Sequence, residues 1–336
     1  MTNTQKCSKD KVSVLDEIDI IAEARKQAKA DQKFYGGIKV LAPAKVNLFL
    51  GVSEKDASDF HPVDTVLHTL VLHDVLYMRK VSRETPDAQF SLKFHCKMCE
   101  GLPDLNIPAE KNLAYKAIMK LYEELEVKPD CDIEVVLEKH IPTQSGLGGG
   151  SSDAAAALLG AAHLWGIDKN DKLLEQIASQ LGCDVPFFLR GGCAYYEGRG
   201  DIFKKELSSG KSSVVLIRPN EGVSTALAYE TFDAYNFAIE ENSWKQLDNA
   251  KDWNDVPLCN NLAYASEKLV EDLASIKLWA EKQSGCSCLL SGSGSVSFVL
   301  CPDLNTAQNL AQSAQVKGWW ARTTQLSPLG VSVLPL

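Results

Sequence analysis

The stretch that decides the fold is PTQSGLGGGSSDAAA, residues 142–156. It contains four glycines: Gly146, Gly148, Gly149 and Gly150. They lie between a predicted strand at Ile133–Leu137 and a predicted alanine-rich helix over Ser151–Trp165. Glycine lets a backbone approach a ligand closely and adopt a positive φ, and the first turn of a helix offers unpaired N–H groups and partial positive charge. This order of elements predicts an anion site, best suited to phosphate.

The predicted phosphate site runs from Gly146 to Ser152 and includes Leu147. Ser151 and Ser152 can cap the helix, contact a phosphate oxygen or help to hold Mg²⁺. Asp153 follows in the first helical turn, where it complements the helix dipole, helps to hold Mg²⁺ or slightly opposes a triphosphate. The alternative is a plain flexible loop with a serine cap, which rarely shows this order of strand, glycines, serines and helix.

Two common nucleotide-binding patterns do not fit. A P-loop requires a glycine, four residues and then Gly-Lys-Ser/Thr, but no lysine follows the glycines of residues 146–150. The segment 210–212 reads Gly-Lys-Ser, yet Lys205 stands where the pattern needs glycine and a strand is predicted to follow. A dinucleotide pattern that starts at Gly146 ends on Ser151, without doubly wound surroundings.

Composition limits the possible partners. The chain has 336 residues, which is too long for one ordinary domain, and 35 basic against 44 acidic side chains give a net charge of −9. This balance, without a run of Lys and Arg, argues against nucleic acid. No window approaches the roughly 18 apolar residues of a membrane helix, and residues 1–25 do not resemble a secretory signal. We expect a cytoplasmic protein without a membrane partner, as a monomer or a homodimer.

The ten cysteines are expected to be reduced thiols. Cys96-x-x-Cys99 and Cys286-x-Cys288 invite a zinc interpretation. Neither has a second pair at suitable spacing, and His95 is adjacent to Cys96 rather than correctly offset. Small buried or surface thiols are therefore the better interpretation.

Strands and helices alternate without regular βαβ repeats, which predicts an α+β fold. Strands are predicted at Val66–Met78, Phe90–Phe94, Ile133–Leu137, Cys193–Tyr196, Val214–Ile217, Cys288–Ser291 and Val296–Leu300. Helices are predicted at Val14–Ala28, Lys111–Leu125, Ser151–Trp165, Lys172–Leu181, Leu262–Leu278 and Thr306–Gln315. A polar stretch over Lys204–Ser213 is the best internal boundary.

A further strand is predicted near Ile38–Leu50. Because Pro43 lies inside it, we expect the strand to start after the proline or to lie at a sheet edge. Alternation with a period of two predicts one face with Lys45, Asn47 and Phe49. The opposite face would carry Val46, Leu48 and Leu50. A lysine on the less apolar face is usually solvated.

Three motifs, in order, resemble the GHMP kinase superfamily. They are APAKVNLFL at residues 42–50, the glycine loop, and LLSGSGS at residues 289–295, which in the family abuts the phosphate loop. The resemblance implies a two-domain α+β fold: an ATP-binding N-terminal domain related to domain 2 of ribosomal protein S5 and a smaller ferredoxin-like C-terminal domain, with the active site between them. We expect an N-terminal extension at 1–34, the ATP-binding domain at 35–206 and the substrate-side domain at 207–336.

Within the superfamily, the chain most resembles the 4-diphosphocytidyl-2-C-methyl-D-erythritol kinases of the non-mevalonate isoprenoid pathway. The similarity lies in the segment 59–61, Asp-Phe-His, and in GCDVPFFLRGG at residues 182–192. It implies ATP and Mg²⁺ as cofactors. The Mg²⁺ would be held mainly by the ATP phosphates, and Ser152 is the candidate protein ligand. It also implies Asp184 as the catalytic base, since an attacking alcohol must lose a proton. Lys45 would lie beside Asp184 and stabilise developing negative charge.

The same resemblance implies the other contacts. His61 would hydrogen-bond the cytosine of the substrate, Tyr229 would stack on it, and Phe60 would complete the pocket. Asn47 matches a substrate-contacting residue. Asn112 matches a residue near the nucleoside of ATP. The other histidines have no such context and are interpreted as structural or surface residues: His68, His73, His95, His140 and His163.

The resemblance has departures and rivals. The segment before His61 lacks the glycine typical of the family, and Pro62 follows the histidine, so we expect the loop geometry at the cytidine site to depart from the family more than the catalytic residues do. The nearest rival function is a superfamily kinase for homoserine, mevalonate or a mevalonate phosphate. A non-catalytic metabolite sensor on the same fold is weaker, because such a protein need not keep Lys45 and Asp184. An acidic interaction protein of unrelated fold would leave three ordered motifs unexplained.

Overall fold

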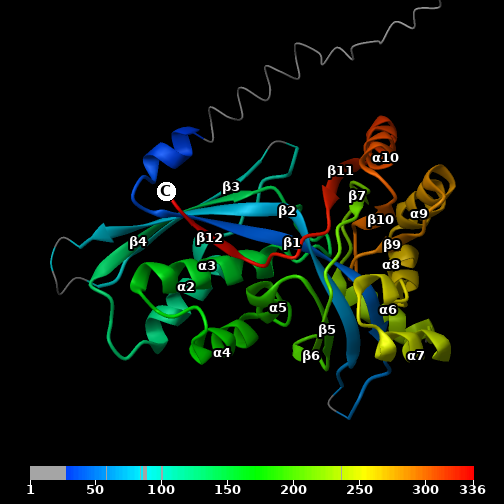
Figure 1. Ribbon diagram of the computed structural model, residues 1–336, viewed down its shortest axis with the longest axis horizontal. Helices are drawn as coiled ribbons and strands as arrows, with labels where there is room; N and C mark the ends of the chain where they lie inside the picture. The colour runs from blue at the N-terminus through cyan, green and yellow to red at the C-terminus, as the bar shows by residue number, and fades with distance from the viewer. Residues whose placement is uncertain (1–27, 58, 84, 86–88, 100, 236) are drawn as a thin grey trace, which may run out of the picture.

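The computed structural model describes residues 28–57, 59–83, 85, 89–99, 101–235 and 237–336 (Figure 1). The predicted helix over Val14–Ala28 lies almost wholly outside the described residues. The first sheet contains β1 (Ile38–Val52), β2 (Val63–Ser82), β3 (Leu92–Met98), β4 (Cys131–Lys139), β5 (Cys193–Glu197), β6 (Ile202–Leu207), β8 (Cys259–Asn260) and β12 (Ser332–Pro335). The second contains β7 (Ser213–Arg218), β9 (Cys288–Leu290), β10 (Ser297–Cys301) and β11 (Trp320–Gln325).

Four helices lie on one face of the first sheet (Figure 1): α2 (Leu113–Glu124), α3 (Gly149–Trp165), α4 (Lys172–Leu181) and α5 (Val185–Arg190). The central one, α3, is buried along most of its length because its alanines let it pack closely on β1 and β2. Gly160 shows how close this packing is, since a Cβ there would lie 2.4 Å from the sulfur of Met78. The helix that carries the glycine loop is thus anchored in the core.

The second sheet has the order β11-β7-β10-β9 and is antiparallel throughout. Its βαββαβ chain order, with α9 (Glu271–Ser284) and α10 (Leu304–Val316) as the two helices, is the ferredoxin-like motif that the family resemblance implied. The remaining helices are α6 (Thr225–Tyr235), α7 (Glu241–Asn249) and α8 (Ala263–Leu269), with short 3-10 turns at Ala109–Lys111 and Trp253–Asp255. The α+β prediction is therefore confirmed. Among the described helices, none combines the length and apolar character needed to cross a membrane.

Several predicted elements differ from those observed. The single helix predicted over Leu262–Leu278 is two helices, α8 and α9, that meet at Val270, where the backbone is extended. Seven short elements were not predicted: α5, α6, α7, β6, β8, β11 and β12. The polar stretch at Lys204–Ser213 begins inside β6 of the first sheet and ends at the first residue of β7 in the second. β12 then returns to pair with β1, and the domain division at residue 206 stays a prediction.

The two expectations about Pro43 are wrong. β1 begins at Ile38, five residues before Pro43, and lies between β12 and β2 rather than at an edge of the sheet. The proline is tolerated because β12 pairs only with residues 38–41 and because the β1–β2 register shifts between Pro43 and Lys45. On the β12 side, the missing N–H group of Pro43 therefore has no ladder partner to serve.

The predicted faces of β1 change at Phe49. A second register shift, between Asn47 and Phe49, reverses the alternation of side chains. Phe49 consequently packs in the core with Val46 and Leu48, whereas Leu50 lines the same cavity as Lys45 and Asn47. Lys45 is also buried rather than solvated.

His68 provides a test of this core. It is buried, its Nδ1 donates to the Thr69 carbonyl at 2.9 Å, and its Nε2 accepts from the Gly210 N–H at 3.2 Å. Burial lowers the pKa of His68 from 6.5 to about 4. The unfolded chain thus binds a proton that the folded chain does not, so the free energy of unfolding should fall by about 3 kcal/mol as pH drops from 6.5 to 4.

Denaturant unfolding at several pH values measures this contribution. His68→Gln, which keeps an acceptor and a donor but no titrating ring, should show a shallower decline over the same pH window. Equal slopes for the two proteins would show that His68 does not titrate differently on folding.

Candidate active site

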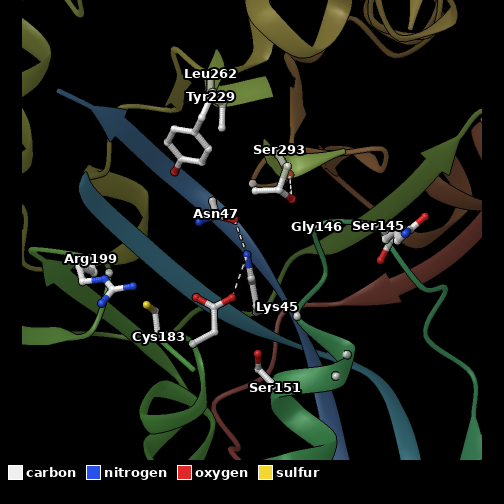
Figure 2. Close-up of a pocket in the computed structure, with 18 of the residues that line it drawn as sticks. Lys45, Asn47, Ser145, Gly146, Ser151, Cys183, Arg199, Tyr229, Leu262 and Ser293 are labelled. Atoms are coloured by element: carbon white, nitrogen blue, oxygen red, sulfur yellow. Dashed lines mark hydrogen bonds and ion pairs between the residues drawn. The ribbon is translucent and has the colours of Figure 1, made fainter. Parts of the chain in front are cut away.

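A cavity of about 850 Å³ lies where the two sheets and the helix ends meet. Figure 2 shows that its walls come from distant parts of the chain: β1, the loop before α3, the start of α5, helix α6 and the turn before β10. Most of the predicted site residues line it: Lys45, Asn47, Phe60, His61, Asn112, Gly146, Gly148, Gly149, Gly150, Ser151, Asp184 and Tyr229. Residues more than 180 positions apart in the sequence therefore line the same cavity.

The glycine loop leads directly into α3, which begins at Gly149, two residues before the predicted start. Gly148 is its N-cap residue with φ of 72°, a left-handed conformation that favours glycine. Gly146, with φ of 75°, packs against the turn at residues 291–294, and a Cβ there would lie 1.9 Å from the Ser291 carbonyl oxygen. The Ser291 hydroxyl donates to the Gly146 carbonyl at 2.9 Å. The third motif thus supports the glycine loop.

Two predicted members of the phosphate site do not line the cavity. Leu147 is buried in the core, and its carbonyl accepts from the Lys45 backbone N–H at 3.0 Å. Ser152 is fully buried, and its hydroxyl has no hydrogen-bond partner among the described residues. Of the two serines at the start of α3, Ser151 is the one that lines the cavity (Figure 2).

Asp153 is engaged in a buried ion pair. Lys139 Nζ lies 2.5 Å from Asp153 Oδ2 and also contacts Asp74 Oδ2. Burial is the main reason that the pKa of Asp153 is raised, with Lys139 acting against it and Asp74 adding to it. Because α3 begins at Gly149, Asp153 lies beyond the first turn in which the sequence had placed it, and Lys139 explains how this carboxylate is tolerated in the core.

Lys45 and Asp184 form the charged centre of the cavity (Figure 2). Their Nζ and Oδ2 atoms are 3.7 Å apart, and Lys45 Nζ donates to Asn47 Oδ1 at 2.6 Å. Asn47 is held in turn by donating its amide to Thr65 Oγ1 at 2.8 Å. Burial lowers the pKa of Lys45, while the negative charge of Asp184 opposes that shift. Asp184 itself, with its side chain 32% exposed at the start of α5, is open to a ligand.

Aromatic side chains line another part of the cavity. The rings of His61 and Tyr229 are 5.3 Å apart and inclined by 36°, and burial raises the pKa of Tyr229 to about 12, so its hydroxyl stays neutral. The guanidinium of Arg199 lies over the ring of Phe60, with its Cζ atom 4.7 Å from the ring centroid. Asn112 is the N-cap of α2, and its side chain accepts from the Ala114 N–H.

Sequence reasoning missed several polar residues of the cavity: Lys55, Thr65, Lys111, Arg199 and Asp233. Arg199 and Lys111 are the cavity cations without a salt bridge among the described residues, because Lys45, Lys55 and Lys139 each face a carboxylate. The only local signal for Arg199 is its place between Gly198 and Gly200, which indicates a tight turn rather than a ligand contact.

The fold and this arrangement define a phosphotransferase of the GHMP kinase class. The model of the GHMP kinases N terminal domain matches residues 112–192, which include the glycine loop and Asp184. A homoserine kinase from Cytophaga hutchinsonii is 20% identical with a TM-score of 0.63, covering 89% of this chain and 98% of its own. At that identity the likeness shows the fold.

More similar proteins narrow the class. A 4-diphosphocytidyl-2-C-methyl-D-erythritol kinase of Exiguobacterium sibiricum is 34% identical over 277 residues, 81% of this chain and 92% of the relative. One of Pelotomaculum thermopropionicum is 34% identical over 278 residues, covering 82% and 92%. The crystal structure of a 4-(cytidine 5'-diphospho)-2C-methyl-D-erythritol kinase is 30% identical with a TM-score of 0.68, covering 86% and 99%. The chain belongs to the 4-diphosphocytidyl-2-C-methyl-D-erythritol kinase family.

Proposed function

We propose that this protein is an ATP-dependent kinase that phosphorylates the 2-hydroxyl of 4-diphosphocytidyl-2-C-methyl-D-erythritol, in the non-mevalonate route to isoprenoid precursors. The observation that carries the proposal is that one cavity joins a phosphate loop, a Lys–Asp pair and a pocket lined by aromatic rings. A cytidine held in that pocket would use its binding energy to place the distant hydroxyl beside Asp184. The names of the family members support the same substrate.

The roles of the charged pair follow from its geometry. Asp184 would accept the proton of the attacking hydroxyl, since its carboxylate is open to the cavity and lies beside a buried ammonium group. Lys45 would orient that carboxylate and stabilise the charge that develops on the transferred phosphoryl group. Asn47 holds the ammonium group at 2.6 Å, so Lys45 needs little reorganisation during the reaction.

Mg²⁺ fits this cavity as an ion held mainly by ATP. Mg²⁺ sites of this kind use one or two protein oxygens together with substrate phosphates. Among the described residues there is no group of three or more His, Cys, Asp or Glu side chains that could hold a metal, and Ser151 and Asp184 are side chains with oxygen atoms that line the cavity. When bound, the ion neutralises phosphate charge. Ser152, expected from sequence to help, faces the core instead.

The competing superfamily functions share the fold, so the substrate pocket must separate them. A homoserine or mevalonate kinase does not need the paired rings of His61 and Tyr229. ADP release should be measured with Mg-ATP and the cytidylyl substrate, beside homoserine and mevalonate. Turnover of the cytidylyl substrate alone supports the proposal. Turnover of homoserine or mevalonate instead would keep the kinase function and change the substrate that we assign. ATP binding without any turnover would favour a metabolite sensor.

Arg199 is predicted to bind the diphosphate of the substrate. Its guanidinium carries no salt bridge among the described residues and sits over Phe60 beside the base pocket. Arg199→Met should raise KM for the cytidylyl substrate by about tenfold, because an arginine–phosphate bond is charge-assisted, with a smaller change in kcat. Steady-state kinetics with each substrate varied in turn measure this effect.

Lys111→Met is the matched control for Arg199→Met. Lys111 is the other unpaired cation of the cavity among the described residues, but it adjoins Asn112, the residue predicted to lie near the nucleoside of ATP. It should alter KM for ATP and leave KM for the second substrate unchanged. The reverse pattern in the two variants would contradict the assignment of the two halves of the cavity.

A further inference from the structure

His61 is enclosed in the cavity wall. Its side chain is 6% exposed, and its Nδ1 faces the Ser53 carbonyl oxygen at 2.8 Å. Because a carbonyl only accepts, Nδ1 carries a proton. Nε2 is itself buried and faces Asp233 Oδ1 at 2.9 Å, without an aligned hydrogen bond among the described residues. His61 therefore packs against the carboxylate of Asp233 and helps to position it.

Lys55 holds the other side of the Asp233 carboxylate. Lys55 Nζ lies 2.9 Å from Asp233 Oδ2 and 3.4 Å from Asp59 Oδ1. His61 faces one carboxylate oxygen of Asp233 and Lys55 faces the other, so the two side chains together fix the orientation of the carboxylate.

The carboxylate of Asp233 also has acceptor capacity left. Its side chain is 36% exposed and lines the cavity beside Tyr229. The two carboxylate oxygens offer about four acceptor positions, of which Lys55 and His61 face two. A ligand stacked against Tyr229 would therefore meet a further acceptor position on Asp233.

An acceptor at this place is complementary to cytosine and not to uracil. Cytosine carries an amino donor at C4, whereas uracil carries an oxygen acceptor there. The amino group of cytosine would donate to the carboxylate of Asp233. Uracil would place its oxygen against the same carboxylate, and the two acceptors would repel each other.

We propose that Asp233 is a specificity-determining residue of the base pocket. Its carboxylate accepts a hydrogen bond from the exocyclic amino group of cytosine. This inference rests on the proposed function, since it concerns how the same pocket distinguishes a cytidine from a uridine. Asp233 lies in α6, 172 residues from His61 along the chain, and the pair exists only in the folded protein.

The affinities of the full-length protein for CDP and UDP test the proposal. Calorimetric titrations should use saturating non-hydrolysable ATP analogue, so that neither probe binds at the phosphate loop. The unmodified protein should prefer CDP by at least about 100-fold. In Asp233→Asn the amide can also donate, so the preference should fall by about tenfold or more, mainly through weaker CDP binding. Glu230→Gln, which alters an exposed cavity residue on the same helix, should keep the preference.

Each result decides between distinct conclusions. A preference for CDP that is unchanged in Asp233→Asn, or an unmodified protein that binds CDP and UDP equally, overturns the role of Asp233 while leaving the kinase function in place. Failure of the unmodified protein both to bind CDP and to phosphorylate the cytidylyl substrate overturns the proposed function with it. If Asp233→Asn is unstable, Asp233→Ser and the ratio of kcat/KM for cytidylyl and uridylyl substrates give the same comparison.

Discussion

Asp184→Asn should lower kcat by about 10²- to 10⁴-fold, the usual contribution of a positioned general base. The asparagine keeps the shape of the side chain at the start of α5 but cannot take a proton from the attacking hydroxyl. Both substrates should still bind, because the glycine loop and the base pocket are untouched. Single-turnover rates, together with equilibrium binding of each substrate, separate loss of chemistry from loss of binding.

The charge of Lys45 adds to this effect. Burial already lowers the pKa of Lys45, and Asp184 is the group that counteracts it. Removing the carboxylate therefore shifts the pKa of the lysine further down, and the variant should lose part of the positive charge beside the phosphoryl group as well as the base. Asp171→Asn is a suitable control, since Asp171 is also a helix N-cap but lies outside the cavity. Turnover of Asp184→Asn within tenfold of the unmodified protein would exclude Asp184 as the base.

Gly146→Ala should reduce kcat/KM for ATP by about 100-fold or more. The added Cβ would lie 1.9 Å from the Ser291 carbonyl oxygen, far inside van der Waals contact, and φ of 75° is costly for alanine by about 1–2 kcal/mol. The loop must move away from the turn at residues 291–294, which displaces the N–H groups of α3 from the phosphates. ATP binding and thermal unfolding should both be measured.

Gly285→Ala separates backbone strain from steric overlap. Gly285 ends α9 with φ of 68°, close to that of Gly146, but a Cβ there would meet nothing within 4 Å. It should cost about 1–2 kcal/mol of stability without changing KM for ATP. If both variants bind ATP as well as the unmodified protein, the close contact of Gly146 with the Ser291 turn is not needed for the phosphate site.

Local patterns determined much of this protein. The glycine loop specifies a left-handed backbone and a helix start through residues that are neighbours in the chain, and α4 matches its predicted bounds of Lys172–Leu181 because its apolar period is regular. Lys45 and Asp184 were found for a similar reason, since each lies in a short motif. Their placement in one cavity agrees with these motifs, although their catalytic roles stay predictions.

Only the tertiary structure decided which side chains share a surface. The register shift after Asn47 exchanges Phe49 for Leu50 at the cavity, and Pro43 fits inside β1 because the strand has no β12 partner at that point. Arg199 and Asp233 lie in no recognisable motif. The folded chain places Arg199 over Phe60 and Asp233 beside His61, although each pair is more than 130 residues apart in the sequence. Periodicity and φ preferences are encoded between near neighbours, whereas register, bulges and ion pairs depend on long-range contacts that a linear pattern does not contain.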